Sequence, residues 1–218
     1  MVIMLNVLVA AYFLLFLFLA WKNFRLAVIL FIIFLPAYLI RFEIGPLPST
    51  VLELSFGALF LVWLIKYSRQ DLKNIFAVSQ RHKILFIAFD LFFLSSVVSV
   101  LISDLFILSL GVWRAYFLEP MILFLILIGR KDALKTIDLI WGLSLSTLSI
   151  SVYAIVQKFT GWGIATPEWS SEATRRATAF FSSPNAVGLY LAPVLMLMVA
   201  VIASKAKQSQ STGGTNNG

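Results

Sequence analysis

The stretch ILFIAFDLFFLSSVVSVLI, from Ile84 to Ile102, decides the class of this protein. Asp90 is its only charged residue, and its length falls within the roughly 17–25 residues that an α-helix needs to cross a bilayer. The whole chain has the same character, since 61% of its 218 residues are hydrophobic, 12% are charged and the mean hydropathy is +0.96. Soluble domains carry about twice that share of charged residues. We therefore predict a membrane protein.

Further apolar runs, separated by charged residues, predict an all-α, polytopic transmembrane helix bundle of about seven helices. The predicted spans are Ile3–Ala20, Leu26–Ile40, Val51–Ile65, Ile84–Ile102, Ala115–Ile128, Ile137–Val156 and Ala186–Ala203. Pro36 should kink the second span, because proline lacks a backbone donor. Leu105–Leu110 either extends the fifth span or lies along the interface. The first span lacks a basic segment before it and is expected to remain rather than to be cleaved as a signal.

Beyond Ala203 the chain reads SKAKQSQSTGGTNNG and contains no aromatic or branched aliphatic residue. Such a segment cannot bury apolar surface, so we expect residues 204–218 to form a disordered polar tail behind the transmembrane domain of residues 1–203. The abrupt change also fits a chain cut short from a longer reading frame.

The orientation follows from the basic residues, because lysine and arginine accumulate on the cytoplasmic side of a membrane protein. The alternation of spans places 12 of the 17 basic residues on one side and leaves Arg41, Arg114, Lys158, Arg175 and Arg176 on the other. We therefore predict that the amino terminus lies outside and the carboxyl end inside. The net charge of +7 has the same origin, so we expect no nucleic acid partner.

The longest segment predicted outside runs from Gln157 to Asn185. Ser182 or Ser183 can cap the next helix with Pro184 in its first turn, because proline loses no hydrogen bond there. The free N–H groups of that helix, together with Arg175 and Arg176, could hold a phosphate. The alternative is an interfacial loop whose arginines touch lipid headgroups and whose Trp162 and Trp169 belong to an aromatic belt.

Three stretches carry a resemblance to a known family. The string RATAFFSSPNAVGLYLAP, from Arg176 to Pro193, resembles the R-x-T-G-T-F-x-x-P-N-x-x-G/A-x-x-L segment of the O-antigen ligase and O-antigen polymerase superfamily. PAYLIR (36–41) with PSTVLE (48–53), and GVWR (111–114) with Glu119 and Pro120, are similar to its amino-terminal half. Ala179 and Phe180 stand where the family commonly has glycine and then threonine.

The resemblance implies transfer of a glycan from a polyprenyl-pyrophosphate carrier to an acceptor at the outer face of a bacterial inner (cytoplasmic) membrane, without metal or cofactor. It places Arg176 in the glycan-lipid site, with Arg175 beside it and Asn185 shaping the turn into the helix. Family members are about twice as long, and a later outward loop supplies their catalytic histidine. The only histidine here, His82, falls in a predicted cytoplasmic loop, so we expect this polypeptide alone not to transfer glycan, and we assign no catalytic residue.

Other charged residues remain open to two interpretations. Arg114 and Glu119, at the start of the fifth predicted span, could line an outward cavity beside Arg176, or could form a structural ion pair with each other or with Arg41. Asp90 lies inside an apolar span, where acids are costly and often functional, yet it could pair with Lys83.

Two other classes of protein are compatible with this pattern. A small membrane transporter or lipid-linked oligosaccharide flippase also has many apolar helices, although it should carry polar groups at the midplane on broken helices. A non-catalytic membrane subunit is the third possibility.

Overall fold

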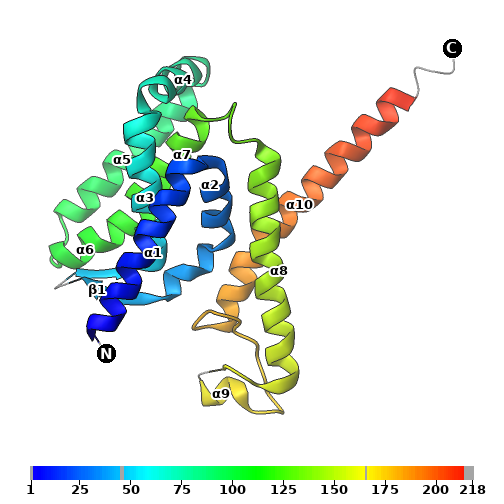
Figure 1. Cartoon of the computed structure of the whole chain (residues 1–218). Helices are drawn as coiled ribbons and strands as arrows, with labels where there is room; N and C mark the ends of the chain where they lie inside the picture. Colours follow the sequence, from blue (N-terminus) through cyan, green and yellow to red (C-terminus); the bar gives the residue numbers. More distant parts are fainter. Residues whose placement is uncertain (1, 45–46, 165, 214–218) are drawn as a thin grey trace. The chain divides into compact units, whose positions relative to one another are not determined.

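The computed structural model describes residues 2–44, 47–164 and 166–213, and almost all of them lie in helices (Figure 1), which confirms the all-α class. The elements are α1 Val2–Lys22, α2 Phe24–Ile33, the 3-10 helix η1 Leu35–Leu39, strands β1 Arg41–Ile44 and β2 Leu47–Thr50, α3 Val51–Lys66, α4 Ser68–Arg81, α5 Lys83–Leu101, α6 Phe106–Trp113, the π-helix η2 Arg114–Leu118, α7 Glu119–Gly129, α8 Thr136–Thr160, α9 Pro167–Ser170 and α10 Pro184–Gly213.

The chain is divided into two compact units. Unit 1 comprises Met1–Phe31 and Ile40–Thr136, and unit 2 comprises Ile32–Leu39 and Ile137–Gly218. Arg114 and Glu119 therefore belong to unit 1, whereas Arg175, Arg176 and Asn185 belong to unit 2.

Unit 1 is built on the contact of α1 with α3 and of α4 with α7. Ala20 and Ala58 are fully buried, and such small residues let membrane helices approach closely. The Tyr12 and Ser55 hydroxyls join α1 to α3 by a hydrogen bond of 2.6 Å. The short antiparallel hairpin of β1 and β2, which the sequence analysis did not predict, leads directly into α3, with Arg41 opposite Thr50.

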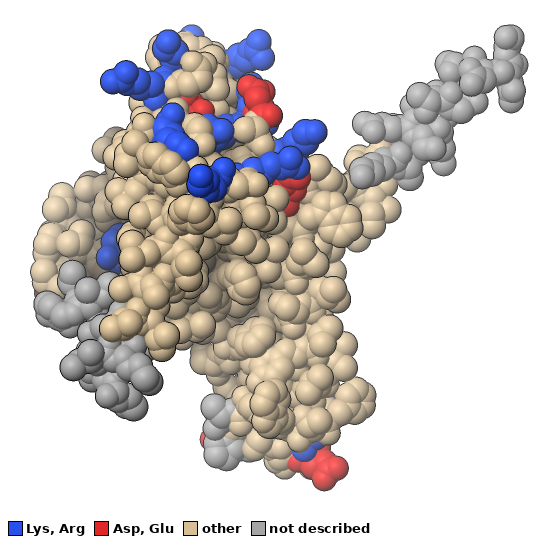
Figure 2. Space-filling view, in the orientation of Figure 1, with Lys and Arg blue, Asp and Glu red and all other residues tan. Residues whose placement is uncertain are grey.

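One end of unit 1 is basic, and we call it the basic end. It comprises the junctions α1–α2, α3–α4–α5 and the segment after α7, and Figure 2 shows the Lys and Arg side chains gathered over α4 and around it. Two side-chain contacts tie these junctions together. The Lys66 ammonium donates to the Trp21 carbonyl at 2.8 Å, and the Arg130 guanidinium lies 3.7 Å from the centre of the Tyr67 ring.

Unit 2 is organised around Ile150 of α8, Ala179 and Phe181, which are buried and pack against Tyr153 and Tyr190. The Ser146 side chain is fully buried, and its hydroxyl meets the Tyr190 hydroxyl of α10 at 2.7 Å. The run of small hydroxyl residues in α8 thus provides a hydrogen bond between two apolar helices, which is how polar residues join helices in membranes.

Four helical segments of the described residues are long and apolar enough to cross a membrane: Lys83–Leu101, Phe106–Gly129, Thr136–Thr160 and Pro184–Ser204. A fifth results if α3 and α4, which are bent by 93° relative to each other, count as one span. The α2 helix ends at Ile33 and Pro36 lies in η1, so the second predicted span, Leu26–Ile40, is interrupted. A multi-pass arrangement is supported, while the count of seven and the orientation stay predictions.

The α10 helix begins at Pro184, as the serine–serine–proline pattern predicts, and runs to Gly213. It thereby continues past Ala203, where the seventh span was expected to end. Residues 214–218 of the expected disordered tail lie outside the described residues.

Candidate functional site

A π-helical turn interrupts the apolar segment Phe106–Gly129, and Pro120 explains it. Proline has no N–H to donate and its ring collides with the carbonyl of the preceding turn, so a regular α-helix cannot pass through it unchanged. Here the Glu119 N–H donates to the Arg114 carbonyl, five residues back, instead of to the residue four back. Such π-bulges are frequent at functional sites.

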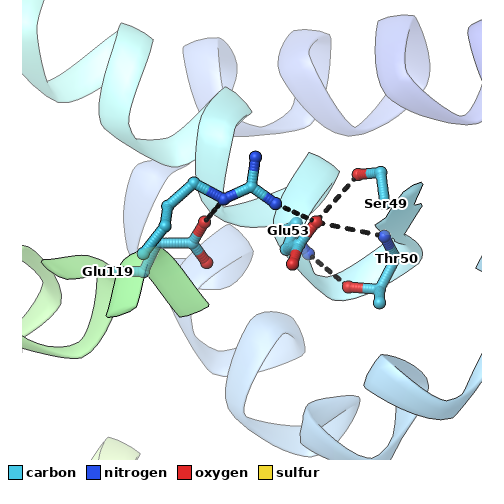
Figure 3. Close-up of polar contacts among 5 residues, drawn as sticks. Ser49, Thr50, Glu53 and Glu119 are labelled. Carbon is cyan, nitrogen blue, oxygen red and sulfur yellow. Dashed lines mark hydrogen bonds and ion pairs between the residues drawn. The ribbon is translucent and has the colours of Figure 1, made fainter. Parts of the chain in front are cut away.

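Arg114 and Glu119, the two ends of this turn, meet Glu53 of α3 in a three-residue ion cluster that we call the Arg114 cluster (Figure 3). Arg114 Nη2 lies 2.8 Å from Glu53 Oε2, and Arg114 Nε lies 3.5 Å from Glu119 Oε1. Both carboxylates are largely buried, at 17% and 18% side-chain exposure, whereas Arg114 is 43% exposed. Arg114 is thus the most exposed side chain of the cluster, while its Nε is buried.

Glu53 is held in place by the start of its own helix. Thr50 and Glu53 form a capping box, in which the Thr50 hydroxyl accepts from the Glu53 N–H at 3.1 Å and Glu53 Oε2 accepts from the Thr50 N–H at 3.2 Å. The Ser49 hydroxyl donates to the same oxygen at 2.9 Å (Figure 3). Glu53 was not predicted as a site residue, although the T-x-x-E spacing before an apolar run was a signal for its position.

The Arg114 cluster lies well away from the basic end. From Glu119 to Gly129 the α7 helix rises roughly 15 Å, and from Glu53 to Lys66 the α3 helix rises roughly 20 Å, at 1.5 Å per residue. Along these two helices, the cluster is therefore separated from the basic end by roughly 15–20 Å.

The sequence interpretation left open whether Leu105–Leu110 extends the fifth span or lies along the interface. Ala115–Ile128 was predicted as the span, which placed Arg114 and Glu119 at its start. The α6 helix continues through η2 into α7 without a break, which favours the extension, so the apolar segment begins at Phe106 and Arg114 and Glu119 lie in its interior. Of the open alternatives, the ion pair of Arg114 with Glu119 is present, and no bond of either with Arg41 is found among the described residues.

A cavity of about 280 Å³ lies between α5 and α6, and Trp113 is one of its lining residues. Its polar lining consists of Ser96, Ser99, Ser103 and Ser109. The Trp113 indole N–H donates to the Ser96 hydroxyl at 2.9 Å. This bond holds the side chain of the residue that precedes Arg114 in the sequence.

In unit 2, Arg176 and Asn185, both predicted as site residues, are in contact. Arg176 Nη2 donates to Asn185 Oδ1 at 3.2 Å, and both side chains are exposed. Asn185 lies in the first turn of α10, where its backbone N–H donates to the Ser183 hydroxyl at 3.3 Å. The guanidinium is therefore held at a helix start, where the positive end of the helix dipole favours an anion. The N–H groups of Asn185 and Ala186 are already bonded to Ser183.

Arg175 has a different environment from its neighbour. Its Nη1 donates to the carbonyls of Phe159 and Lys158 at 2.9 and 3.3 Å, and its Nε donates to the Ser170 carbonyl at 3.3 Å. These contacts satisfy carbonyls at the end of α8, where a positive charge also interacts favourably with the helix dipole. The structure thus gives Arg175, which was predicted to bind substrate, a capping role.

The loop before α10 is shaped by Gln157, a residue that the sequence analysis placed at the edge of the outward segment. Gln157 is fully buried within α8. Its Oε1 accepts from the N–H groups of Thr178 and Ala179 at 2.9 and 2.7 Å, and its Nε2 donates to the Ala179 carbonyl at 3.1 Å. Ala179 has a φ of 48°, a left-handed conformation that glycine adopts readily. No sequence signal distinguished this glutamine from a solvated one.

Asp90 and His82 lie outside the clusters described above. Asp90 is exposed on α5, and its side chain has no hydrogen bond or ion pair within the described part of the chain, so the alternative pairing with Lys83 is not found there. His82 directly follows α4 as its C-cap residue and is exposed. Across residues 2–44, 47–164 and 166–213, no group of three His, Cys, Asp or Glu side chains is placed to hold a metal ion.

Comparison with protein-family models, with curated proteins and with solved structures finds no match for this chain.

Proposed function

We propose that this chain is an O-antigen ligase-like protein of a bacterial inner membrane that binds a polyprenyl-pyrophosphate-linked glycan through Arg176 and the start of α10. The observation that carries the proposal is the exposed Arg176 guanidinium bonded to Asn185 at the first turn of that helix. Asn185 occupies one Arg176 nitrogen, and the others have no partner among the described residues. Guanidinium groups bind phosphate oxygens in a bidentate fork.

The backbone of the loop gives independent support. Ala179 stands where the resembled segment has glycine, and its φ of 48° is a conformation that favours glycine. Gln157 fixes this turn, which directly follows Arg176 in the chain, through three buried hydrogen bonds. A preformed loop loses less conformational entropy when it binds a ligand.

A transporter or lipid-linked oligosaccharide flippase is the second candidate, and the Arg114 cluster favours it. Charged residues inside an apolar segment are costly and commonly mark a substrate or ion pathway. Arg114 and Glu119 flank a π-helical turn within Phe106–Gly129, which is the combination of polar groups and an interrupted helix expected of a transporter.

The test of the first proposal is binding of a short polyprenyl pyrophosphate to the purified chain in lipid nanodiscs, with the corresponding polyprenol as the uncharged comparison. Arg176→Ala should weaken pyrophosphate binding roughly 10- to 100-fold, the equivalent of about 1.5–3 kcal/mol for hydrogen bonds to a charged group. Lys131→Ala removes an exposed positive charge from the basic end and should leave the affinity unchanged. Equal affinity for polyprenol and pyrophosphate, or an unchanged affinity of the Arg176 variant, would contradict the proposal.

The two candidates separate in proteoliposomes loaded with a fluorescent lipid-linked sugar. A flippase predicts movement of the sugar across the bilayer that is lost in Arg114→Gln and retained in Arg176→Ala. The ligase-like proposal predicts no such movement by the unmodified chain.

A further inference from the structure

The α4 helix, Ser68–Arg81, is a 14-residue helix that was not predicted from the sequence, and its composition differs from that of the predicted spans. It carries Arg69, Asp71, Lys73 and Arg81, and its 14 residues would rise only about 21 Å. It is bent by 93° from the apolar α3 that precedes it. A helix this short and this charged cannot complete a membrane crossing, but it can lie along a membrane surface.

Its angle is fixed by a buried polar contact at the basic end. The Asp71 side chain is 5% exposed, accepts a hydrogen bond from the Trp63 indole at 2.9 Å and lies 3.5 Å from the Arg130 guanidinium. On the same face, Asn74 donates to the Gly129 carbonyl at 2.8 Å. A side chain at Gly129 would lie 2.8 Å from Asp71 Cβ, so α4 and α7 are in direct contact.

The face of α4 that is turned away from this contact is apolar along one side and basic along the other. Leu72 and Phe76, one helical turn apart, are 55% and 66% exposed. Ala77 lies about 140° around the helix from Leu72, since successive residues turn by about 100°, and it is exposed as well. Arg69 and Lys73 are exposed and lie on the same turns as the two apolar side chains.

We propose that α4 lies in the headgroup region of the membrane, with Leu72 and Phe76 inserted at the acyl boundary and Arg69 and Lys73 bound to acidic phospholipid headgroups. Charge complementarity identifies the partner, because basic residues gather over α4 and around it (Figure 2) and a bilayer with acidic lipids attracts them. Two large apolar side chains beside these cations would otherwise face water. The helix serves as a surface anchor at the basic end, independently of any lipid-linked substrate.

The chain contains no cysteine, so single cysteines at α4 can be spin-labelled without further changes. The labels go on Leu72→Cys, Phe76→Cys and, as the matched control, Ala77→Cys, in liposomes of phosphatidylcholine with a phosphatidylglycerol fraction. Collision with dissolved oxygen, which concentrates in lipid, should exceed collision with a water-soluble nickel chelate at positions 72 and 76. The order should be reversed at position 77.

A second arm tests the headgroup contact. Adding phosphatidylglycerol to phosphatidylcholine liposomes should deepen the label at position 76, and Arg69→Gln with Lys73→Gln should abolish that shift. High nickel-chelate contact at all three positions, or labels at 72 and 76 shielded from both reagents by protein, would overturn the proposal. So would a depth that does not respond to phosphatidylglycerol in the protein that keeps Arg69 and Lys73.

Discussion

Replacing Arg130 by methionine should destabilise unit 1 strongly, and more than Asp71→Asn does. Methionine keeps an unbranched side chain over the Tyr67 ring but leaves the Asp71 carboxylate, 5% exposed, with the Trp63 indole as its remaining side-chain partner. Breaking a buried ion pair in this way costs about 3–5 kcal/mol, because an uncompensated charge stays buried.

Asp71→Asn should cost less, about 1–2 kcal/mol. The amide oxygen can still accept from Trp63, while Arg130 at 16% exposure keeps access to water and its contact with Tyr67. The double variant should be more stable than Arg130→Met alone, since no carboxylate is then left behind. The free energies of unfolding can be measured in mixed detergent micelles as a double-mutant cycle. Equal losses for the two single variants, or a double variant no more stable than Arg130→Met, would refute this reasoning.

Three further predictions concern backbone and packing, each checked by the same unfolding measurement. Gly129→Ala should lower the free energy of unfolding by about 1–3 kcal/mol, because its new carbon would lie 2.8 Å from Asp71 Cβ. Gly57→Ala is the matched control: its new carbon would have nothing within 4 Å, so it should stabilise α3 by about 0.5–1 kcal/mol. Ala179→Val should destabilise unit 2 by at least about 1 kcal/mol, because a branched side chain is strained at a φ of 48°. Ala179→Gly should be close to neutral. Equal losses of stability in the two variants would contradict the left-handed conformation of Ala179. Gln157→Leu should cost about 3 kcal/mol or more, since it leaves two buried N–H groups and a carbonyl without their partner; a loss below about 1 kcal/mol would show that water replaces the glutamine.

The helical class and several helix boundaries could be predicted because they depend on local sequence. A continuous apolar run is sufficient for a membrane-length helix, and the start of α10 at Pro184 follows from residues next to it. The contact of Arg176 with Asn185 lies within the same short segment, so the string that suggested a site also contained both partners.

What could not be predicted depends on contacts between distant segments. The charges of α4 separate apolar runs and therefore suggest a loop, yet Asp71 is buried by Trp63 and by Arg130, which lies far along the chain. The role of Glu53 beside Arg114 needs the packing of α3 against η2. The two arginines in sequence, Arg175 and Arg176, are chemically equivalent until the end of α8 takes one of them as its cap.

The side of the membrane that Arg176 faces decides whether it can meet a lipid-linked glycan outside the cell. Because the chain has no cysteine, Ser171→Cys in the segment before Arg176 and Gln80→Cys at the basic end can be tested with a membrane-impermeant maleimide on intact cells. We predict that Ser171→Cys is labelled on intact cells and that Gln80→Cys is labelled only after the inner membrane is opened. Labelling of Gln80→Cys alone on intact cells, or of both positions, would contradict the predicted orientation and with it the proposed site.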